Sequence, residues 1–306
     1  MIILNFQRMS TEDGPGLRTT LFFKGCPLKC RWCHNPESIS PRPHTEWTAV
    51  KCIGCGTCLA VCPDKAISSK DGKIVIDFSL CQRCGKCAEE CPAGAIEVKG
   101  VKMSADEAFA ILIKDKAYWG KDGGVTLSGG EALSQSAEAA ELLKKLKEAG
   151  VHTAVDTCGF CGKKDIDNVY PYTDLFLYDL KLSDELLHKH FTGQGPDIIK
   201  ENYLYLAEKC KTDGKGLWVR TPVIPGATDC VENIKVLAEF IGDTADKWEL
   251  CSFNNLCRDK YERLYTEWEF AKTPLVKKQR MEQLAETARK AGVKNVIWSG
   301  MTLMEG

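Results

Sequence analysis

Three cysteines stand close together in the segment KGCPLKCRWCHNPE, residues 24–37: Cys26, Cys30 and Cys33, with the spacing C-x3-C-x2-C. Cysteine thiolates are ligands of iron–sulfur clusters and of zinc. A closed site needs four ligands, so three cysteines leave one coordination position open for an exogenous ligand. The alternatives are a zinc site completed by His34 or a distant side chain, and three buried thiols without metal. The triad follows an expected strand directly, in a loop with glycine and proline, which favours the open cluster.

Two further cysteine groups share the spacing C-x2-C-x2-C-x3-C-P and are offset by 29 residues. This run is typical of bacterial ferredoxins, in which the fourth cysteine of each run ligates the other cluster. Zinc ribbons instead carry two separated C-x2-C pairs, which makes structural zinc the weaker alternative. The sequence therefore predicts two [4Fe–4S] clusters, one held by Cys52, Cys55, Cys58 and Cys91 and the other by Cys62, Cys81, Cys84 and Cys87.

The composition excludes several classes of function. Of the 306 residues, 44% are hydrophobic and 27% are charged, and the net charge is −1. These values give no support to binding of nucleic acid or of a membrane surface. The first residues, MIILNFQRMS, have too short an apolar run for a secretion signal, and no stretch approaches the ~18 apolar residues of a membrane span. We expect a cytosolic protein, in which the seventeen cysteines serve metal binding and not disulfides.

The elements around the cysteines alternate between strands and helices. Short apolar and β-branched runs predict strands, and runs rich in Ala, Leu, Glu and Lys predict helices. The expected strands cover residues 16–25, 124–129, 152–157, 175–181, 217–223, 247–253 and 295–300, and the expected helices cover 104–119, 135–150, 232–242 and 277–292. Such alternation predicts an α/β fold with a parallel sheet and outer helices, here a partial (β/α)6-type TIM barrel.

The four-cysteine repeat interrupts this barrel. We expect residues 1–45 and 101–306 to form the barrel and residues 46–100 to form an inserted ferredoxin-like domain with two [4Fe–4S] clusters. In a barrel, functional residues lie at the C-terminal ends of the strands. The unusual residues of this chain follow that rule: Cys26, Gly129, Gly130, Glu131, Asp156, Thr157, Asp179, Lys181, Arg220 and Asn254.

The motifs together resemble a known family. They are DGPGLR (13–18), KGCPLKCRWCHNPE (24–37), TLSGGEAL (126–133), DTCGF (156–160), YDLKLSDELLHKHFTG (178–193) and RTPVIPGATD (220–229), which cover most of the chain in order. They are similar to the glycyl radical enzyme activating enzymes of the radical S-adenosylmethionine (SAM) superfamily, of which the pyruvate formate-lyase activating enzyme is the best-known member. The insert is similar to the branch that activates dehydratases, decarboxylases and lyases. The resemblance implies that reductive cleavage of SAM gives a 5′-deoxyadenosyl radical, which abstracts hydrogen from a glycine Cα of a partner glycyl radical enzyme.

The resemblance also assigns residues to the site. The unique iron of the three-cysteine cluster is expected to bind the amino and carboxylate groups of SAM. Further SAM contacts are expected from Trp32, His34, Gly129, Gly130, Glu131, Asp156, Asp179, Lys181, Arg220 and Asn254. Asp156, Thr157 and Asp179 resemble positions that hold a monovalent cation, and Asp13 resembles a position near the incoming glycine loop. Plainer interpretations are strand-end capping, turn geometry and packing. Many relatives have histidine where Asn254 stands, so this contact is made by asparagine or is lost.

The expected cofactors are therefore three [4Fe–4S] clusters, SAM and a monovalent cation, and the expected electron donor is a flavodoxin or ferredoxin-type protein. A monomer is expected. Two other functions stay open: a radical SAM enzyme acting on a small molecule or peptide, and a ferredoxin-like electron carrier whose barrel is only a scaffold. A carrier needs no SAM pocket, so the GGE, DLK and IPG motifs oppose it. The six remaining cysteines are expected to be free thiols in packing or loop positions: Cys158, Cys161, Cys210, Cys230, Cys251 and Cys257.

Overall fold

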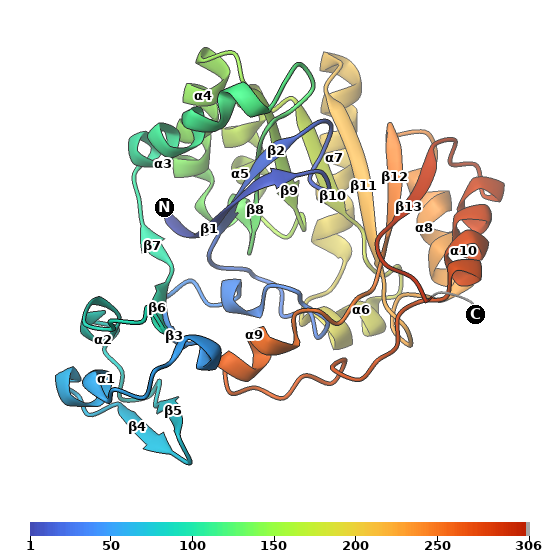
Figure 1. Ribbon diagram of the computed structural model, residues 1–306. Coiled ribbons are helices and arrows are strands. Elements are labelled where there is room, and N and C mark those ends of the chain that lie inside the picture. The colour runs from blue at the N-terminus through green and yellow to red at the C-terminus, as the bar shows by residue number, and fades with distance from the viewer. Residues whose placement is uncertain (304–306) are drawn as a thin grey trace.

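A sheet of nine strands forms the centre of the computed structural model, which describes residues 1–303 (Figure 1). The strand order is β13-β12-β11-β10-β9-β8-β2-β1-β7. The seven strands from β2 to β13 are parallel: β2 (Arg18–Phe23), β8 (Gly124–Gly129), β9 (His152–Thr157), β10 (Leu175–Asp179), β11 (Gly216–Val223), β12 (Lys247–Ser252) and β13 (Val296–Ser299). The prediction of an α/β fold on a parallel sheet is confirmed, in agreement with a partial barrel.

The antiparallel edge of this sheet is an addition to the expected fold. β1 (Ile2–Ser10) pairs with β2 on one side and with the short β7 (Val101–Lys102) on the other. The sequence of β1 gave no strand prediction. β7 begins where the chain returns from the inserted unit, so this edge of the sheet is directly connected to that unit.

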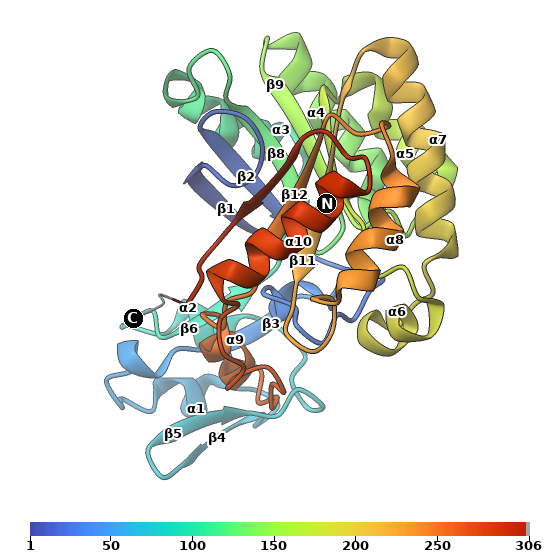
Figure 2. The ribbon, with the colours of Figure 1, turned by 90° about the vertical axis from the view of Figure 1, so that its right-hand side faces the viewer.

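Helices connect the parallel strands and cover the outer face of the sheet (Figures 1 and 2). They are α3 (Ala105–Leu112), α4 (Ser136–Glu148), α5 (Lys163–Val169), α7 (Asp197–Asp213), α8 (Val231–Ile241) and α10 (Lys278–Lys290). The helix expected over 104–119 is shorter, because α3 continues as 3-10 turns over Ile113–Tyr118. α5 and α7 were not predicted. In the part of the chain described, no helix is both long and apolar enough to cross a membrane.

The sheet buries its two faces differently. Along β11 every second residue is fully buried against the helices, with Leu217 and Val219 1% or less exposed. The alternate residues face the interior of the curved sheet, because successive side chains of a strand point to opposite faces. Trp218 packs there with Ala154, Leu175 and Leu177. The next inward residue of β11 is Arg220, one step nearer the C-terminal end of the strand. An apolar layer therefore lies beneath a polar one inside the sheet.

Two short helices and the inserted unit gather at the C-terminal ends of the parallel strands (Figure 1). α6 (Glu185–Thr192) follows β10, and α9 (Arg258–Arg263) follows β12. The loop after β2 lies against α6, where the amides of Lys29 and Arg31 donate to the carbonyl oxygens of Thr192 and Phe191. This loop carries the three-cysteine group.

The inserted unit has its own small apolar cluster, which includes Cys58, Ile67, Ile76, Cys87 and Ile96. Its elements are β3 (His44–Trp47) paired with β6 (Ile96–Lys99), β4 (Ile67–Lys70) paired with β5 (Lys73–Ile76), and the short helices α1 (Thr57–Val61) and α2 (Lys86–Glu89). The sequence repeat is also a backbone repeat. Four positions with positive φ recur at the offset of 29: Gly54 and Arg83, Gly56 and Gly85, Lys65 and Gly94, and Asp71 and Gly100.

Candidate active site

The three cysteines of the barrel lie in a loop that backbone hydrogen bonds hold firmly. The amide of Cys26 donates to the carbonyl oxygen of Ile39 at 3.0 Å, and the amide of Cys33 donates to that of Cys30 at 3.0 Å. Trp32 packs between Phe191 and Phe270, at ring distances of 5.7 and 6.4 Å. The loop is therefore fixed at both ends and in its middle, and all three cysteines line one cavity.

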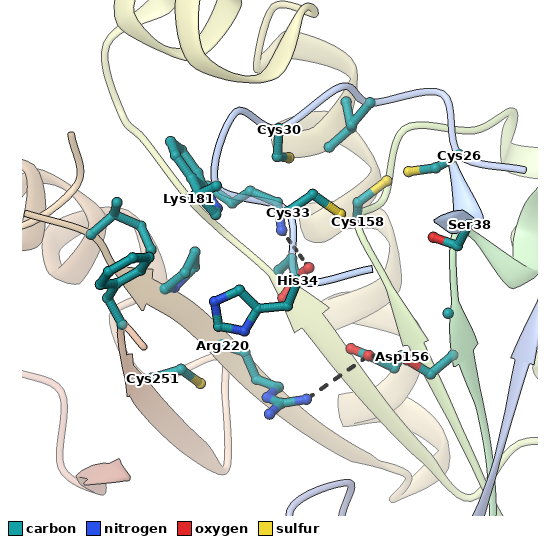
Figure 3. A pocket seen from close by; sticks show the side chains of 18 of the residues that line it. Cys26, Cys30, Cys33, His34, Ser38, Asp156, Cys158, Lys181, Arg220 and Cys251 are labelled. Carbon is teal, nitrogen blue, oxygen red and sulfur yellow. Dashed lines mark hydrogen bonds and ion pairs between the residues drawn. The ribbon is translucent and has the colours of Figure 1, made fainter. Parts of the chain in front are cut away.

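That cavity has a volume of about 490 Å³ and opens at the C-terminal ends of the parallel strands. Its walls include Ser128, Asp156, Asp179, Arg220 and Cys251, which the strand alternation brings to the inner face of the sheet. Figure 3 shows the three cysteines along one side of the cavity and Asp156, Arg220 and Cys251 on the other. The sequence thus placed its cysteine triad and its charged strand-end residues in the same space.

Asp156 is the most perturbed acid of the cavity. Burial raises its pKa from 3.8 to about 7, against the opposing effect of the Arg220 guanidinium 3.9 Å away. Its Oδ2 accepts a 2.6 Å hydrogen bond from Ser128, while its buried Oδ1 has no hydrogen-bond partner among the described residues. A buried oxygen of this kind requires a ligand, water or ion. This orphaned oxygen fits the expected role of Asp156 beside SAM or a cation.

Asp179 and Lys181 form an ion pair at the cavity wall, with Nζ 2.5 Å from Oδ2. Burial lowers the pKa of Lys181, but the Asp179 carboxylate together with the thiols of Cys30 and Cys158 outweighs it, and the net shift is upward. Lys181 therefore stays protonated. Lys181 and Arg220 thus place two cations in the cavity wall beside the carboxyl groups of Glu12, Asp156 and Asp179, a pattern that suits a ligand bearing both an ammonium and a carboxylate.

The glycines after β8 are required by the backbone around them. A Cβ on Gly129, which has φ +103°, would lie 2.5 Å from the amide nitrogen of Phe23. A Cβ on Gly130 would lie 2.4 Å from the carbonyl oxygen of Gly25. Both glycines line the cavity, so they let β8 approach the cysteine loop closely. Any larger residue would push that loop away.

Glu131 does not lie where the sequence interpretation placed it. It is 1% exposed and is not among the residues that line the cavity. Its carboxylate accepts hydrogen bonds from the amides of Leu133 and Cys158 and from the hydroxyl of Thr157, at 2.8–3.0 Å. Burial raises its pKa. In this structure Glu131 therefore joins β8 to β9, and its pairing with a SAM ammonium stays a prediction.

The aromatic and amide residues expected near adenine do line the cavity: Trp32, His34 and Asn254. His34 lies 6.0 Å from the ring of Phe253, and burial lowers its pKa, so the ring is neutral. Its buried Nε2 has no hydrogen-bond partner among the described residues. Asn254 Oδ1 accepts from the amide of Leu256 at 3.2 Å. Asn254 thus reaches the cavity although its side chain is partly used to hold its own loop.

The DGPG loop lies beneath the cavity and not at its rim. Asp13 accepts hydrogen bonds from Ser10 and Thr20, at 2.5 and 2.6 Å, and its other oxygen lies 3.9 Å from Arg220. It is not among the lining residues, whereas its neighbour Glu12 is. Arg18, the last residue of the DGPGLR motif, does not reach the cavity either. Arg18 is fully buried and donates to Val125 and Thr126.

Eight cysteines of the inserted unit fall into two pockets. Cys52, Cys55, Cys58 and Cys91 line one of about 190 Å³, and Cys62, Cys81, Cys84 and Cys87 line the other. Equivalent positions of the two repeats also make the same contact. The amide of Ala66 donates to Cys62 Sγ at 3.3 Å, and the amide of Ala95 donates to Cys91 Sγ at 3.2 Å. These are the crossed sets that the ferredoxin spacing predicts, so the donor chemistry fits a cluster in each pocket.

Within residues 1–303 no three His, Cys, Asp or Glu side chains converge closely enough to hold a single metal ion.

Two cysteines expected to be packing thiols also reach the cavity: Cys158 and Cys251. Figure 3 shows Cys158 beside Cys26. A hydrogen bond between these two side chains lowers the pKa of Cys26 and raises that of Cys158. Sequence reasoning missed Cys158 because it sought thiols by spacing along the chain. The inward alternation of β8 and β12 could have revealed Ser128 and Cys251.

Comparisons with known proteins agree with this geometry. Residues 20–241 match the family model of the radical SAM superfamily. The chain is similar to the trans-4-hydroxy-L-proline dehydratase activating enzyme of Clostridioides difficile, with 35% identity over 92% of this chain and 94% of that protein. It is also similar to the (2S)-3-sulfopropanediol sulfolyase activating enzyme of Bilophila wadsworthia, with 38% identity over 88% of this chain and 90% of that protein. The structure of Streptococcus suis SuiB bound to the precursor peptide SuiA shares the fold, with a TM-score of 0.52 and 15% identity over 92% of this chain and 48% of that chain.

Proposed function

The chain belongs to the radical SAM superfamily and to its glycyl radical enzyme activating enzymes, and we propose that it installs the radical of one partner enzyme by removing hydrogen from a glycine Cα. The observation that carries this proposal is the shared cavity. Three cysteines and a ring of charged residues that includes Asp156, Asp179, Lys181 and Arg220 line the same space of about 490 Å³. The triad alone would bind a cluster, and the charged ring alone would bind a polar ligand.

The three cysteines would hold a [4Fe–4S] cluster with one open iron, and the charged ring would hold SAM against it. When bound, the reduced cluster supplies the electron that splits SAM into methionine and a 5′-deoxyadenosyl radical. Lys181 and Arg220 would orient the carboxylate or ribose of SAM. The free Oδ1 of Asp156, with Thr157 and Asp179 nearby, would take a monovalent cation, since such ions prefer hard oxygen ligands.

The inserted unit would hold two further clusters in its two four-cysteine pockets, and we propose that they relay electrons from a flavodoxin or ferredoxin-type donor. The paired pockets support this role, because each has a complete set of four cysteines and needs no exogenous ligand. We expect the enzyme to act as a monomer in the cytosol, on a partner of the dehydratase or lyase kind that the relatives' names mention.

Partner selectivity would come from placing one C–H bond beside the radical, since such a radical does not discriminate by itself. Asp13 would act from beneath the cavity, through its contact with Arg220. A radical SAM enzyme acting on a small molecule or peptide is the second candidate. The similarity to a structure with a bound precursor peptide concerns the fold alone.

Electron paramagnetic resonance tests the proposal. Anaerobically reconstituted enzyme, reduced and mixed with SAM and the glycyl radical enzyme encoded beside it, should give a doublet split by the remaining glycine α-hydrogen. The matched control is the partner with its radical-site glycine replaced by alanine, which should give no doublet. Robust 5′-deoxyadenosine formation without a doublet in any glycyl radical enzyme tested would favour the small-molecule candidate.

A further inference from the structure

One segment contacts both cysteine-bearing regions of the molecule. It comprises residues 257–270, includes α9, and is called here the bridging segment. Figure 1 shows α9 beside β3 of the inserted unit, below the sheet. The expected site residues come from the strand ends and the cysteine loops, so the proposed function does not involve this segment. Its contacts are nevertheless dense on both sides.

Toward the barrel, the bridging segment holds the main chain around the third cysteine of the triad. The hydroxyl of Tyr261 donates to the carbonyl oxygen of Cys33 at 2.9 Å, and the indole nitrogen of Trp268 donates to that of Arg31 at 2.9 Å. Lys260 Nζ donates to the carbonyl oxygen that follows Cys33 at 3.0 Å. Tyr261 and Trp268 stack on each other, with ring centres 4.9 Å apart. The cysteine loop is thus bound to a rigid aromatic pair.

Toward the inserted unit, the contact is made by Tyr265. Its hydroxyl accepts from the amide of Ile76 at 3.1 Å and donates to the carbonyl oxygen of Ile74 at 3.2 Å. Its ring lies 5.9 Å from that of Phe78. Tyr265 has φ 53°, a conformation that bulky residues adopt rarely and only where the surroundings fix it. A second contact comes from Arg263, 3.5 Å from the buried carboxylate of Glu46.

These contacts meet the side of the inserted unit where the second cysteine set lies. Ile76 lines the pocket of Cys62, Cys81, Cys84 and Cys87, together with Thr45, the neighbour of Glu46. Ile74, the other partner of the Tyr265 hydroxyl, lines the pocket of the first set. Phe78 lies three residues before Cys81. Both sets also have an exposed edge. Val50 is 95% and Ile53 69% exposed beside the exposed Cys55 of the first set, and Leu80 is 53% exposed beside the second set, whose Cys84 is exposed.

We propose that the bridging segment fixes the second four-cysteine pocket against the three-cysteine loop, with Tyr265 and Tyr261 as the positioning residues at its two ends. This rests on the proposed function, because it matters only if both sites hold clusters. If both sites hold clusters, the second set would pass one electron to the three-cysteine cluster and would itself be oxidised in that step. The original reductant would be a one-electron donor protein.

The test uses the reconstituted holoenzyme and hydrogen–deuterium exchange. Tyr265→Phe removes one hydroxyl, and Tyr265→Ala removes the ring as well. Peptides covering residues 73–81 should exchange at least about five-fold faster in Tyr265→Phe, because the lost hydroxyl made two hydrogen bonds and one alone corresponds to about that factor. Tyr265→Ala should show a larger increase. Tyr261→Phe should instead accelerate exchange in residues 31–38. Tyr118, 64% exposed and outside the bridging segment, gives the control Tyr118→Ala, which should change neither.

A second measurement reads the distance between the clusters. In fully reduced holoenzyme, the paramagnetic cluster of the second set should speed the electron-spin relaxation of the three-cysteine cluster. In Tyr265→Ala this effect should be weaker although the variant holds as much iron as the wild type. Dithionite-driven formation of 5′-deoxyadenosine should persist in Tyr265→Ala. If the wild type forms no 5′-deoxyadenosine, the proposed function is contradicted, whereas the bridging role is judged by exchange and relaxation. Unchanged exchange and unchanged relaxation in a fully loaded Tyr265→Ala would overturn the bridging role.

Discussion

The barrel and the inserted unit use cysteine in opposite ways. In the barrel, three cysteines line a cavity of about 490 Å³ whose walls also carry Glu12, Asp156, Asp179, Lys181 and Arg220. In the inserted unit, the first set of four cysteines lines a pocket of about 190 Å³ without any Asp, Glu, Lys or Arg among its described lining residues. The site with three thiols thus has charged residues around it, whereas the first site with four thiols has none among its described lining residues. The difference teaches that an incomplete ligand set is useful only where the surrounding chain can bind the missing ligand.

The largest effect should follow from breaking the incomplete set. Cys30→Ala should abolish reductive cleavage of SAM while about two-thirds of the iron remains, since the two complete sets are untouched. Iron analysis and chromatographic assay of 5′-deoxyadenosine measure the two quantities. Cys210→Ala, which removes a buried thiol of α7, is the control and should keep both. Retained SAM cleavage in Cys30→Ala would show that the open iron is elsewhere.

The crossed pairing inside the inserted unit can be sharpened with two double variants. Cys55→Ala/Cys91→Ala removes two ligands of one predicted set and should lose about 4 of ~12 iron atoms, because one cluster is affected. Cys55→Ala/Cys62→Ala touches both sets and should lose about 8. Each variant thus lacks two cysteines, but the two variants should differ in the amount of iron that they lose. The reverse order of losses would mean that each run binds its own cluster.

The protonation of Asp156 in the barrel cavity should make cation and SAM binding depend on pH. Burial raises the pKa of Asp156 to about 7, so the carboxylate becomes fully charged only above that pH. A cation held by this carboxylate should therefore bind more tightly as pH rises from 6 to 8, and potassium-dependent SAM affinity should rise by up to about ten-fold per pH unit below the pKa. Isothermal titration at several pH values measures it. In Asp156→Asn the affinity should be weak and flat. A wild-type profile in that variant would remove Asp156 from the cation site.

A surface carboxylate of the inserted unit, Glu97, should have only a small effect on stability, in contrast to the buried Asp156 of the barrel. Hydrogen bonds from Lys51 and Lys99 lower the pKa of Glu97 to about 2. Its contribution to stability is present above the unfolded pKa of 4.5 and is lost as pH falls through about 2. Because the pair is largely exposed, Glu97→Gln should cost less than about 1 kcal/mol and lower the melting temperature by less than about 4 °C at pH 7. Scanning calorimetry measures it, with the exposed Glu148→Gln as control. A larger decrease would show that Glu97 supports more than a surface pair.

The sequence predicted what depends on local pattern. All seven parallel strands were located, because short apolar and β-branched runs are distinctive. The two four-cysteine sets came from spacing alone, and the structure places each set around one pocket. The charged strand ends reached the expected cavity because strand direction and alternation place them there.

What the sequence could not predict depends on side chains from distant parts of the chain. Glu131 turns toward Thr157 and Cys158, which offer its carboxylate two donors at the end of β9, and the amide of Leu133 supplies a third. The hydrogen bond between the thiols of Cys26 and Cys158 joins two loops that lie 132 residues apart in the sequence. Likewise, nothing in the local pattern of α9 indicates that Tyr261 meets Cys33. β1 was missed because its alternation is weak, with most of its residues only partly buried or exposed.

The most direct test of the central claim follows the hydrogen atom. The partner glycyl radical enzyme is produced with glycine deuterated at Cα and mixed with reduced enzyme and unlabelled SAM. The account predicts that deuterium appears in 5′-deoxyadenosine, detected by mass spectrometry, in proportion to the glycyl radical formed. It would be contradicted if no deuterium left the glycine-labelled protein while a deuterated small molecule delivered its label to 5′-deoxyadenosine.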